Sequence, residues 1–301
     1  MSALKHIEKM LVTRPIRPAA SCRLFCFPWA GGGTGFFAKW GAQLPATLEV
    51  CVVRLPCREL RMSDAPYPDW PTMVDDIIDT LLPKIQEMPF GIYGHSFGAL
   101  LAFEVARHLK DRHGLRPKHM FLSGTFAPHG DQRRRDRAEF VKMADATDED
   151  FVASLKRNGG TPKELLENEA LIKLFLPSMK HDFRLVGQYR FEGRVSVLDC
   201  PITFFDGTHD KKHDITFKDH KHGKISLKYD SRQHQPAKLC NNLLHKIFSI
   251  HVCAPFHFHF VVWREMTSSD FDIQLLPGGH FFLLDKSNET KITDHIKSKL
   301  R

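Results

Sequence analysis

The sequence predicts an α/β fold in which a mostly parallel central sheet is covered by helices. Over the first two hundred residues, short β-rich apolar runs alternate with longer helical patterns, which is typical of parallel strands joined by helical crossovers. The chain has 301 residues, of which 42% are hydrophobic, so it can bury the core that one large domain of this class needs. We therefore expect a single domain over residues 1–301.

The predicted strands are short apolar runs, rich in β-branched or aromatic residues and bounded by turn residues. One of them, Ile202 to Phe205, has the short β-branched and aromatic pattern of a buried strand. The full set is Cys22 to Pro28, Leu48 to Leu55, Phe90 to Tyr93, Lys118 to Ser123, Ile202 to Phe205 and Phe271 to Leu276.

Helices are predicted between the strands from apolar side chains that recur every three or four residues. Val74 to Gln86 has one apolar face of this kind, and Phe97 to Arg112 repeats the pattern before Gly114. Residues 131–190 are charged, helical in pattern throughout and without a convincing strand. We expect several short amphipathic helices there, inserted between two strands as a lid.

Composition excludes several other classes of protein. Seven Cys are scattered without a CxxC pair, which argues against a disulfide framework or a zinc ribbon and favours a reducing compartment. The first twenty residues carry charges through their only apolar stretch, unlike a secretory signal peptide. Because no run approaches the roughly 18 apolar residues of a membrane-spanning helix, we expect a cytosolic protein without a membrane span.

The net charge of +8 raises the question of a nucleic-acid partner. The charge is unevenly distributed, however. Residues 215–262 hold seven Lys or Arg and two Asp, and so contribute five of the eight net charges. A basic character that belongs mostly to one segment says little about the partner of the whole chain, and we expect no nucleic acid.

The strongest chemical signal is Gly94-His95-Ser96-Phe97-Gly98, a G-x-S-x-G sequence between the predicted strand PFGIY and the predicted helix FGALLAFEVARHL. A serine on such a sharp turn projects its hydroxyl above the sheet. Glycines on either side allow the crowded backbone, and the helix N-terminus favours developing negative charge. A structural turn can have the same letters, but strand, turn and helix together favour Ser96 as a nucleophile.

A serine nucleophile needs a base and an orienting acid, which in this architecture follow it in the order Asp or Glu, then His. His280 lies in the loop Pro277-Gly278-Gly279-His280 after a predicted strand, and is the candidate base. Three carboxylates follow the strand Ile202 to Phe205. We favour Asp210, which is far enough past the strand to reach across to the imidazole, over Asp206 and Asp214.

The glycine-rich segment Phe27-Pro28-Trp29-Ala30-Gly31-Gly32-Gly33 follows the first predicted strand. Its backbone N–H groups could face the serine and form half of an oxyanion hole, with Ala30 as the candidate donor. The other half would be the amide of Phe97. A glycine triplet is more often a plain loop, and a phosphate cradle is disfavoured because no GK[ST] follows.

Six segments agree in order with one known family: FCFPWAGGG, FFAKW, RLPCRE, PFGIYGHSFGALLAFE, NGGTPKELLE and LPGGHFFLLD. They closely resemble the type II thioesterases, and especially the vertebrate thioesterases that release medium-chain acyl groups from fatty acid synthase. The resemblance covers about residues 20–214 and 263–300. Several motifs in the same order are far more specific than G-x-S-x-G alone.

This resemblance implies an α/β-hydrolase fold with a mostly parallel central sheet and a helical lid insertion. It also implies hydrolysis of acyl thioesters carried on the phosphopantetheine arm of the acyl carrier protein domain of fatty acid synthase. By matching positions, the resemblance assigns Ser96 as nucleophile, Asp210 as acid and His280 as base. We expect a monomer that needs neither a cofactor nor a metal ion.

Two features depart from the family. In RLPCRE, Cys57 occupies a position that is usually glycine, so a loop near the site is expected to be restricted. The seventy residues between Asp210 and His280 also exceed the roughly thirty of the relatives, and residues 215–262 are expected to be a His-rich basic insertion. A metal site formed by His220, His222, His257 and His259 is a minor alternative for it, as is an extra strand at FHFHF.

Other functions remain open from the sequence. A lipase or an acyltransferase would use the same three residues on oxygen esters or with an acceptor other than water. Alternatively, the insertion could displace His280, which would leave an inactive isoform that at most binds a carrier protein.

Overall fold

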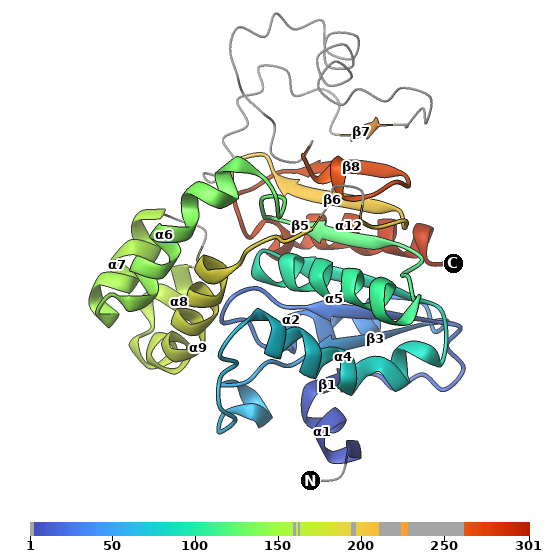
Figure 1. The fold of residues 1–301 in the computed structure, drawn as a ribbon, viewed down its shortest axis with the longest axis horizontal. Helices are drawn as coiled ribbons and strands as arrows, with labels where there is room; N and C mark the ends of the chain where they lie inside the picture. The colour runs from blue at the N-terminus through green and yellow to red at the C-terminus, as the bar shows by residue number, and fades with distance from the viewer. Residues whose placement is uncertain (1–2, 159–160, 162, 194–196, 211–223, 228–261) are drawn as a thin grey trace, which may run out of the picture.

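A computed structural model describes residues 3–158, 161, 163–193, 197–210, 224–227 and 262–301. Its centre is a sheet with the strand order β1-β3-β2-β4-β5-β6-β8-β7, flanked by helices on both faces (Figure 1). The strands are β1 (Leu11–Thr13), β2 (Cys22–Phe27), β3 (Leu48–Val53), β4 (Phe90–His95), β5 (Met120–Ser123), β6 (Ile202–Gly207), β7 (Lys224–Leu227) and β8 (Phe271–Leu276).

The inner strands β3, β2, β4, β5, β6 and β8 run parallel, and only the edge strands β1 and β7 are antiparallel to their neighbours. Every residue of β2, β3, β4, β5 and β6 is buried, which accounts for their mostly apolar sequences, since helices cover both faces of a parallel sheet. The predicted α/β fold with a mostly parallel sheet is therefore confirmed.

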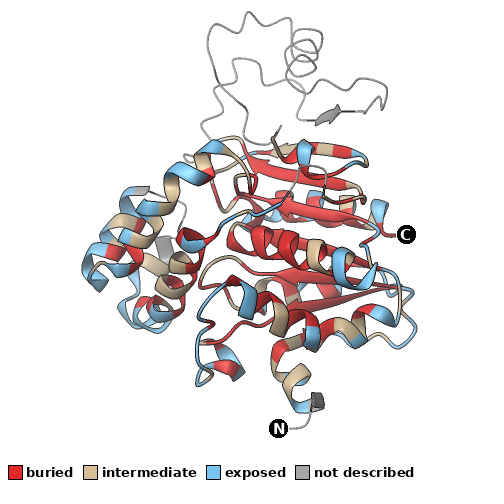
Figure 2. Cartoon of the chain, viewed as in Figure 1, coloured by how far each residue is buried: buried red, intermediate tan, exposed pale blue. Residues whose placement is uncertain are grey.

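Two layers of helices bury the faces of the sheet, and Figure 2 shows the buried centre that results. Side chains of α1 (Ala3–Met10), α4 (Trp70–Gln86) and α5 (Phe97–His113) belong to one hydrophobic cluster. Those of α2 (Gly35–Ala38), α3 (Trp40–Gln43) and α12 (Lys286–Lys299) belong to a second cluster with the other face.

Helix α4 begins four residues before the predicted Val74, because Asp69 caps it by accepting the Thr72 N–H at 2.8 Å. Helix α5 ends at the expected glycine, where Gly114 takes the left-handed conformation of a C-terminal cap. Strand β1 and helix α1 were not predicted, since their apolar patterns are too short to stand out.

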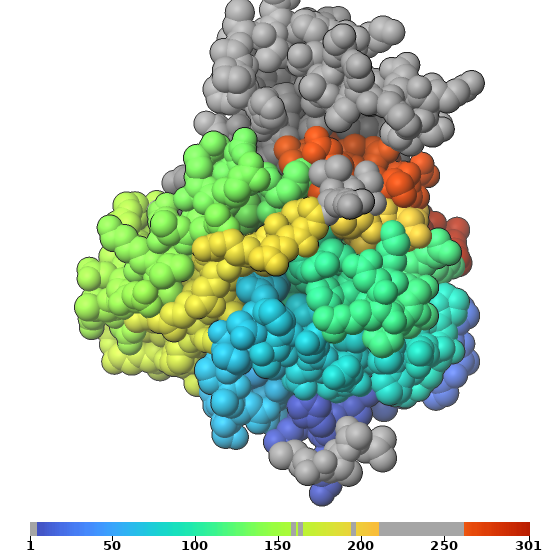
Figure 3. Space-filling view, viewed as in Figure 1, coloured from blue at the N-terminus to red at the C-terminus, as the bar shows by residue number. Residues whose placement is uncertain are grey.

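The segment predicted as a helical lid contains α6 (Asp131–Asp145), α7 (Asp148–Asn158), α8 (Lys163–Glu167) and α9 (Glu169–Gln188). No strand occurs in it among the residues that the structure describes. It has a hydrophobic cluster of its own, which includes Phe151, Leu155 and Leu176. The segment lies at one end of the sheet (Figure 1) and forms a continuous flank beside the core (Figure 3).

Most of the predicted insertion 215–262 lies outside the described residues, including FHFHF and the four histidines considered as metal ligands. Its described part is β7, a strand that the sequence analysis did not predict, which pairs with β8 through Leu227 and Phe271. Strands β6 and β8 are direct parallel neighbours, from Ile202 beside Phe271 to Gly207 beside Leu276. The long connection therefore leaves these two strands adjacent.

Candidate active site

Ser96 lies between β4 and α5, on a turn that only a crowded backbone can make. Its φ of 56° and ψ of −117° are strained for a residue with a side chain. A Cβ at Gly94 would lie 2.3 Å from the Gly98 carbonyl oxygen, and one at Gly98 would lie 2.1 Å from that of Phe27. Both glycines of the motif are therefore required by close packing, and the turn lifts the serine hydroxyl above the end of the sheet.

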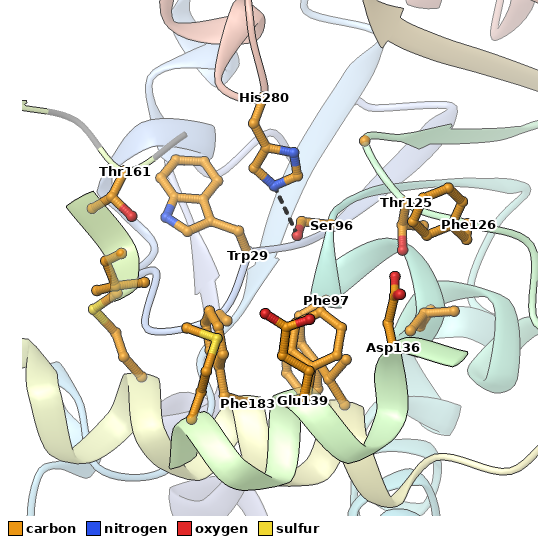
Figure 4. A pocket seen from close by; sticks show the side chains of 18 of the residues that line it. Trp29, Ser96, Phe97, Thr125, Phe126, Asp136, Glu139, Thr161, Phe183 and His280 are labelled. Carbon is orange, nitrogen blue, oxygen red and sulfur yellow. Dashed lines mark hydrogen bonds between the residues drawn. The ribbon is translucent and has the colours of Figure 1, made fainter. Parts of the chain in front are cut away.

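The structure brings the three predicted catalytic side chains together from three strand ends. His280 Nε2 lies 3.1 Å from Ser96 Oγ, and His280 Nδ1 lies 2.7 Å from Asp210 Oδ2. Figure 4 shows the imidazole pointing at the serine hydroxyl. Asp210 is 4% exposed and His280 is 8% exposed, so little water competes for these hydrogen bonds. In this geometry the imidazole can accept the serine proton while the carboxylate holds the other ring nitrogen.

The adjacency of β6 and β8 explains how a separation of seventy residues is bridged. Asp210 follows the carboxyl end of β6, and His280 follows that of β8. Of the competing carboxylates, Asp206 is fully buried at the end of β6 and accepts the N–H of Gly207 at 3.0 Å. Asp214 lies outside the described residues.

The two predicted oxyanion donors flank the serine. Phe97 is the first residue of α5 and Ala30 lies in the loop after β2, and both border the same cavity as Ser96. Within the described part of the chain, neither amide N–H has a hydrogen-bond acceptor. The neighbouring Gly31 N–H is already bonded to Asp182. Of the Ala30 and Gly31 amides, that of Ala30 is thus the one available.

A cavity of about 460 Å³ opens at Ser96, a size typical of small-molecule sites. Its walls come from the glycine-rich loop, the serine turn and the helices α6 and α9. Apolar side chains such as Phe97, Phe140 and Phe183 line part of it, whereas Asp136 and Glu139 extend into it from α6 (Figure 4). A helical lid over residues 131–190 was predicted from the sequence, but none of these α6 and α9 residues was singled out.

Arg133 is the most buried charge in the cavity wall. It is 4% exposed and bonds to Thr125 Oγ1 and, at 3.4 Å, to the Phe126 carbonyl oxygen. Burial lowers the pKa of Arg133 to about 10, so the guanidinium is still charged at neutral pH. The arginine joins α6 to the chain just after β5, at the edge of the cavity.

Among the described residues, no group of three or more His, Cys, Asp or Glu side chains could hold a metal ion. No helix in that part of the chain is both long enough and apolar enough to cross a bilayer.

Comparison with known proteins agrees with this geometry. A family profile described as a thioesterase domain matches residues 22–300. The chain belongs to the thioesterase family. As such it is a thioester hydrolase, and the resemblance noted in the sequence is confirmed.

Curated relatives match this thioesterase over nearly its whole length. It is 32% identical over 289 residues to "S-acyl fatty acid synthase thioesterase, medium chain" of Anas platyrhynchos, with 95% of each chain covered. It is 33% identical to the protein of the same name from Rattus norvegicus, with 96% of this chain and 92% of the relative covered.

Among solved structures, this thioesterase is similar to the RedJ thioesterase of the prodiginine pathway in Streptomyces coelicolor. The TM-score is 0.70 at 28% identity, and 96% of this chain and 91% of that chain are covered.

Proposed function

We propose that this thioesterase hydrolyses medium-chain fatty acyl thioesters on the acyl carrier protein of fatty acid synthase in the cytosol and releases free fatty acids. The observation that carries the catalytic part is the pair of contacts of His280, with Ser96 Oγ at 3.1 Å and with Asp210 Oδ2 at 2.7 Å. The names of the full-length relatives support the carrier protein and the chain length.

In the first half-reaction, His280 Nε2 accepts the Ser96 proton as the serine oxygen attacks the thioester carbonyl carbon. The oxyanion that forms accepts hydrogen bonds from the Phe97 and Ala30 amides. Asp210 stabilises the imidazolium. When the intermediate collapses, the carbon–sulfur bond breaks, the pantetheine thiol takes the proton and the acyl group remains on Ser96.

In the second half-reaction, His280 takes a proton from water, and the hydroxide attacks the acyl ester. The same pair of amides donates hydrogen bonds to the second oxyanion. When this intermediate collapses, the bond between the acyl carbon and Ser96 Oγ breaks, and the serine regains its proton from His280. The helices α6 and α9 act as the lid that shields the acyl-enzyme, and the cavity between them and the serine turn takes the acyl chain.

The decisive experiment compares the wild-type enzyme with Ser96→Ala on decanoyl carrier protein and on a p-nitrophenyl decanoate. We expect at least about a thousandfold loss of kcat, since loss of a triad member removes most of the catalysis. Ser298→Ala on the outer face of α12 is the matched control, because among the described residues its hydroxyl bonds only to the His295 carbonyl oxygen.

Three results would contradict the proposal. Turnover by Ser96→Ala would remove the serine from its role. A wild-type enzyme that cleaves the oxygen ester but not the carrier thioester would favour a lipase. A folded wild-type protein that a fluorophosphonate fails to label would favour an inactive isoform.

A further inference from the structure

One lid residue, Asp182 on α9, lies with its carboxylate directly against the glycine-rich loop. It is 1% exposed, and its Oδ2 accepts the Gly31 N–H at 2.7 Å. Gly31 is bonded in sequence to Ala30, the proposed oxyanion donor. A residue 151 positions further along the chain therefore fixes the peptide next to the one that has to face the reacting carbonyl.

Arg58 completes this contact from the opposite side. Its Nη2 lies 3.0 Å from both oxygens of Asp182, and its Nη1 donates to the Gly32 carbonyl oxygen at 3.1 Å. Arg58 is 3% exposed. Burying an ion pair is costly unless its remaining hydrogen-bonding groups are satisfied, and here the loop backbone satisfies them.

The next residue, Glu59, holds the far end of the loop. Its carboxylate accepts the Thr34 N–H at 2.6 Å and the Thr34 hydroxyl at 2.8 Å, and Arg54 Nε donates to it at 2.7 Å. Cys57 and Glu59 both have positive φ, 62° and 49°. These left-handed turns interrupt the alternation of an extended chain, so that Arg58 and Glu59 both reach the same loop.

Apolar packing presses α9 onto the same point. Gly31 has a φ of +71°, and a Cβ built on it would lie 2.1 Å from Cγ of Met179. Met179 precedes Asp182 by three residues and so lies on the same face of α9. The helix therefore contacts Gly31 through a methionine and a carboxylate at once.

We propose that Asp182, paired with Arg58, is a positioning residue that makes the oxyanion hole depend on the seating of α9. With α9 seated, Gly31 and Gly32 are held and the Ala30 amide faces the serine. With α9 displaced, the Gly31 N–H and the Arg58 guanidinium lose their shared partner and the loop is free to turn. The inference rests on the proposed function, because it concerns the same Ser96 chemistry.

The test measures Asp182→Asn and Asp182→Ala against wild type, with rates normalised to the sites that a fluorophosphonate titrates. We expect kcat to fall about ten- to a hundredfold, less than or comparable with deletion of an oxyanion donor, while KM changes less than about twofold. A decanoyl trifluoromethyl ketone, whose adduct with Ser96 carries an oxyanion, should lose affinity by the same factor as kcat.

The matched control is Asp145→Asn, which breaks the 2.7 Å ion pair between Asp145 and Arg184 Nη2 on the exposed side of the lid. We expect it to leave kcat and ketone affinity unchanged. Wild-type values in Asp182→Asn, or equal losses in Asp145→Asn, would overturn the proposal. So would a loss confined to the number of titratable sites, which a purely structural role predicts.

A second measurement needs no variant. In hydrogen exchange of the wild-type enzyme, the amides of residues 29–34 should open together with those of α9, and loop exchange with α9 still protected would overturn the coupling. Repeating the kinetic comparison on p-nitrophenyl decanoate separates the two proposals. Failure on carrier thioesters by every variant, wild type included, contradicts the proposed substrate, whereas the ester rates still decide the role of Asp182.

Discussion

Cys57 has an unfavourable backbone conformation that the contacts of the residues after it require. Its φ of 62° is a conformation that glycine adopts freely and that strains a residue with a Cβ. The turn is held in place because the next two residues, Arg58 and Glu59, are hydrogen-bonded to the glycine-rich loop at Gly32 and Thr34. The restriction expected at this position from the sequence has its physical origin in that backbone angle.

We expect Cys57→Gly to stabilise the protein by up to about 1 kcal/mol, because relief of the left-handed strain exceeds the added entropy of the unfolded chain. Urea unfolding of the two proteins measures the difference in the free energy of unfolding. Cys200→Ala is a useful comparison, since this buried cysteine lies outside the site and its truncation should destabilise the core. Equal or lower stability of Cys57→Gly would show that the strain is relieved elsewhere.

His119 is expected to make stability depend on pH. Burial, with smaller contributions from the positive charges of Lys299 and His295, lowers the pKa of His119 from 6.5 to about 3. Its neutral ring bonds to Thr203 Oγ1 at 2.8 Å and stacks on Phe121. The unfolded chain takes up the proton more readily than the folded one, so the contribution is neutral above pH 6.5 and destabilising as the pH falls towards 3.

This difference amounts to about 2 kcal/mol at about pH 5. We expect the free energy of unfolding to drop less between about pH 7 and pH 5 in His119→Gln than in the wild type, by roughly that amount. Urea titrations at the two pH values measure it. Parallel losses in the two proteins would show that His119 is protonated as easily in the folded state as in the unfolded one.

At the scale of elements, the start of α12 determines how the loop of His280 is held. The Nδ2 group of Asn288, which is 2% exposed, donates to the carbonyl oxygens of Pro277 at 2.7 Å and Phe282 at 2.9 Å. These two carbonyls lie on either side of His280. One buried side-chain amide therefore bridges the two ends of the loop that contains His280 and links this loop to the helix that follows.

We expect Asn288→Ala to lower the free energy of unfolding by about 2 kcal/mol, because two buried carbonyls lose their donor. It should also lower kcat, as His280 loses its fixed position. Asp294→Ala on the solvent-exposed side of α12 is the control and should change stability by less than about 0.5 kcal/mol. Thermal and urea unfolding, together with thioester turnover, check both expectations.

For the whole molecule, the question is how Asp210 and His280, the proposed acid and base, lie side by side although a long connection separates them in the sequence. Asp210 and His280 meet because β6 and β8 pair directly over six residues of β8. Lengthening a loop adds only about 0.6 kcal/mol per doubling of its length. The strand pairing, which buries apolar side chains along both strands, outweighs that cost.

We therefore expect a variant in which residues 228–261 are replaced by a short Gly/Ser linker to fold and to keep kcat within about threefold of the wild type. Circular dichroism, unfolding in urea and decanoyl carrier protein hydrolysis provide the measurements. A folded deletion variant with no turnover would show that this segment takes part in the reaction or in binding its substrate.

The sequence by itself determined the inner strands, the serine turn and the chain order of the proposed catalytic residues, because each is encoded locally. Strands such as Met120–Ser123 are short and mostly apolar, and the turn at Ser96 requires glycines at fixed positions beside it. The short edge strands β1 and β7 were not predicted, because three or four residues are too few to show a local pattern.

The sequence favoured Asp210, but only the tertiary structure showed that this carboxylate contacts His280 and that the amide of Gly31, next to that of Ala30, is occupied by Asp182. Asp206 lies within β6 and Asp210 follows it, so which carboxylate reaches the imidazole depends on where the chain turns after the strand. Asp182 carries no sequence signal at all, as its contact with Gly31 joins two distant segments. Local patterns report whether a residue is buried, but not which partner it meets, because that partner is set by how the elements pack together.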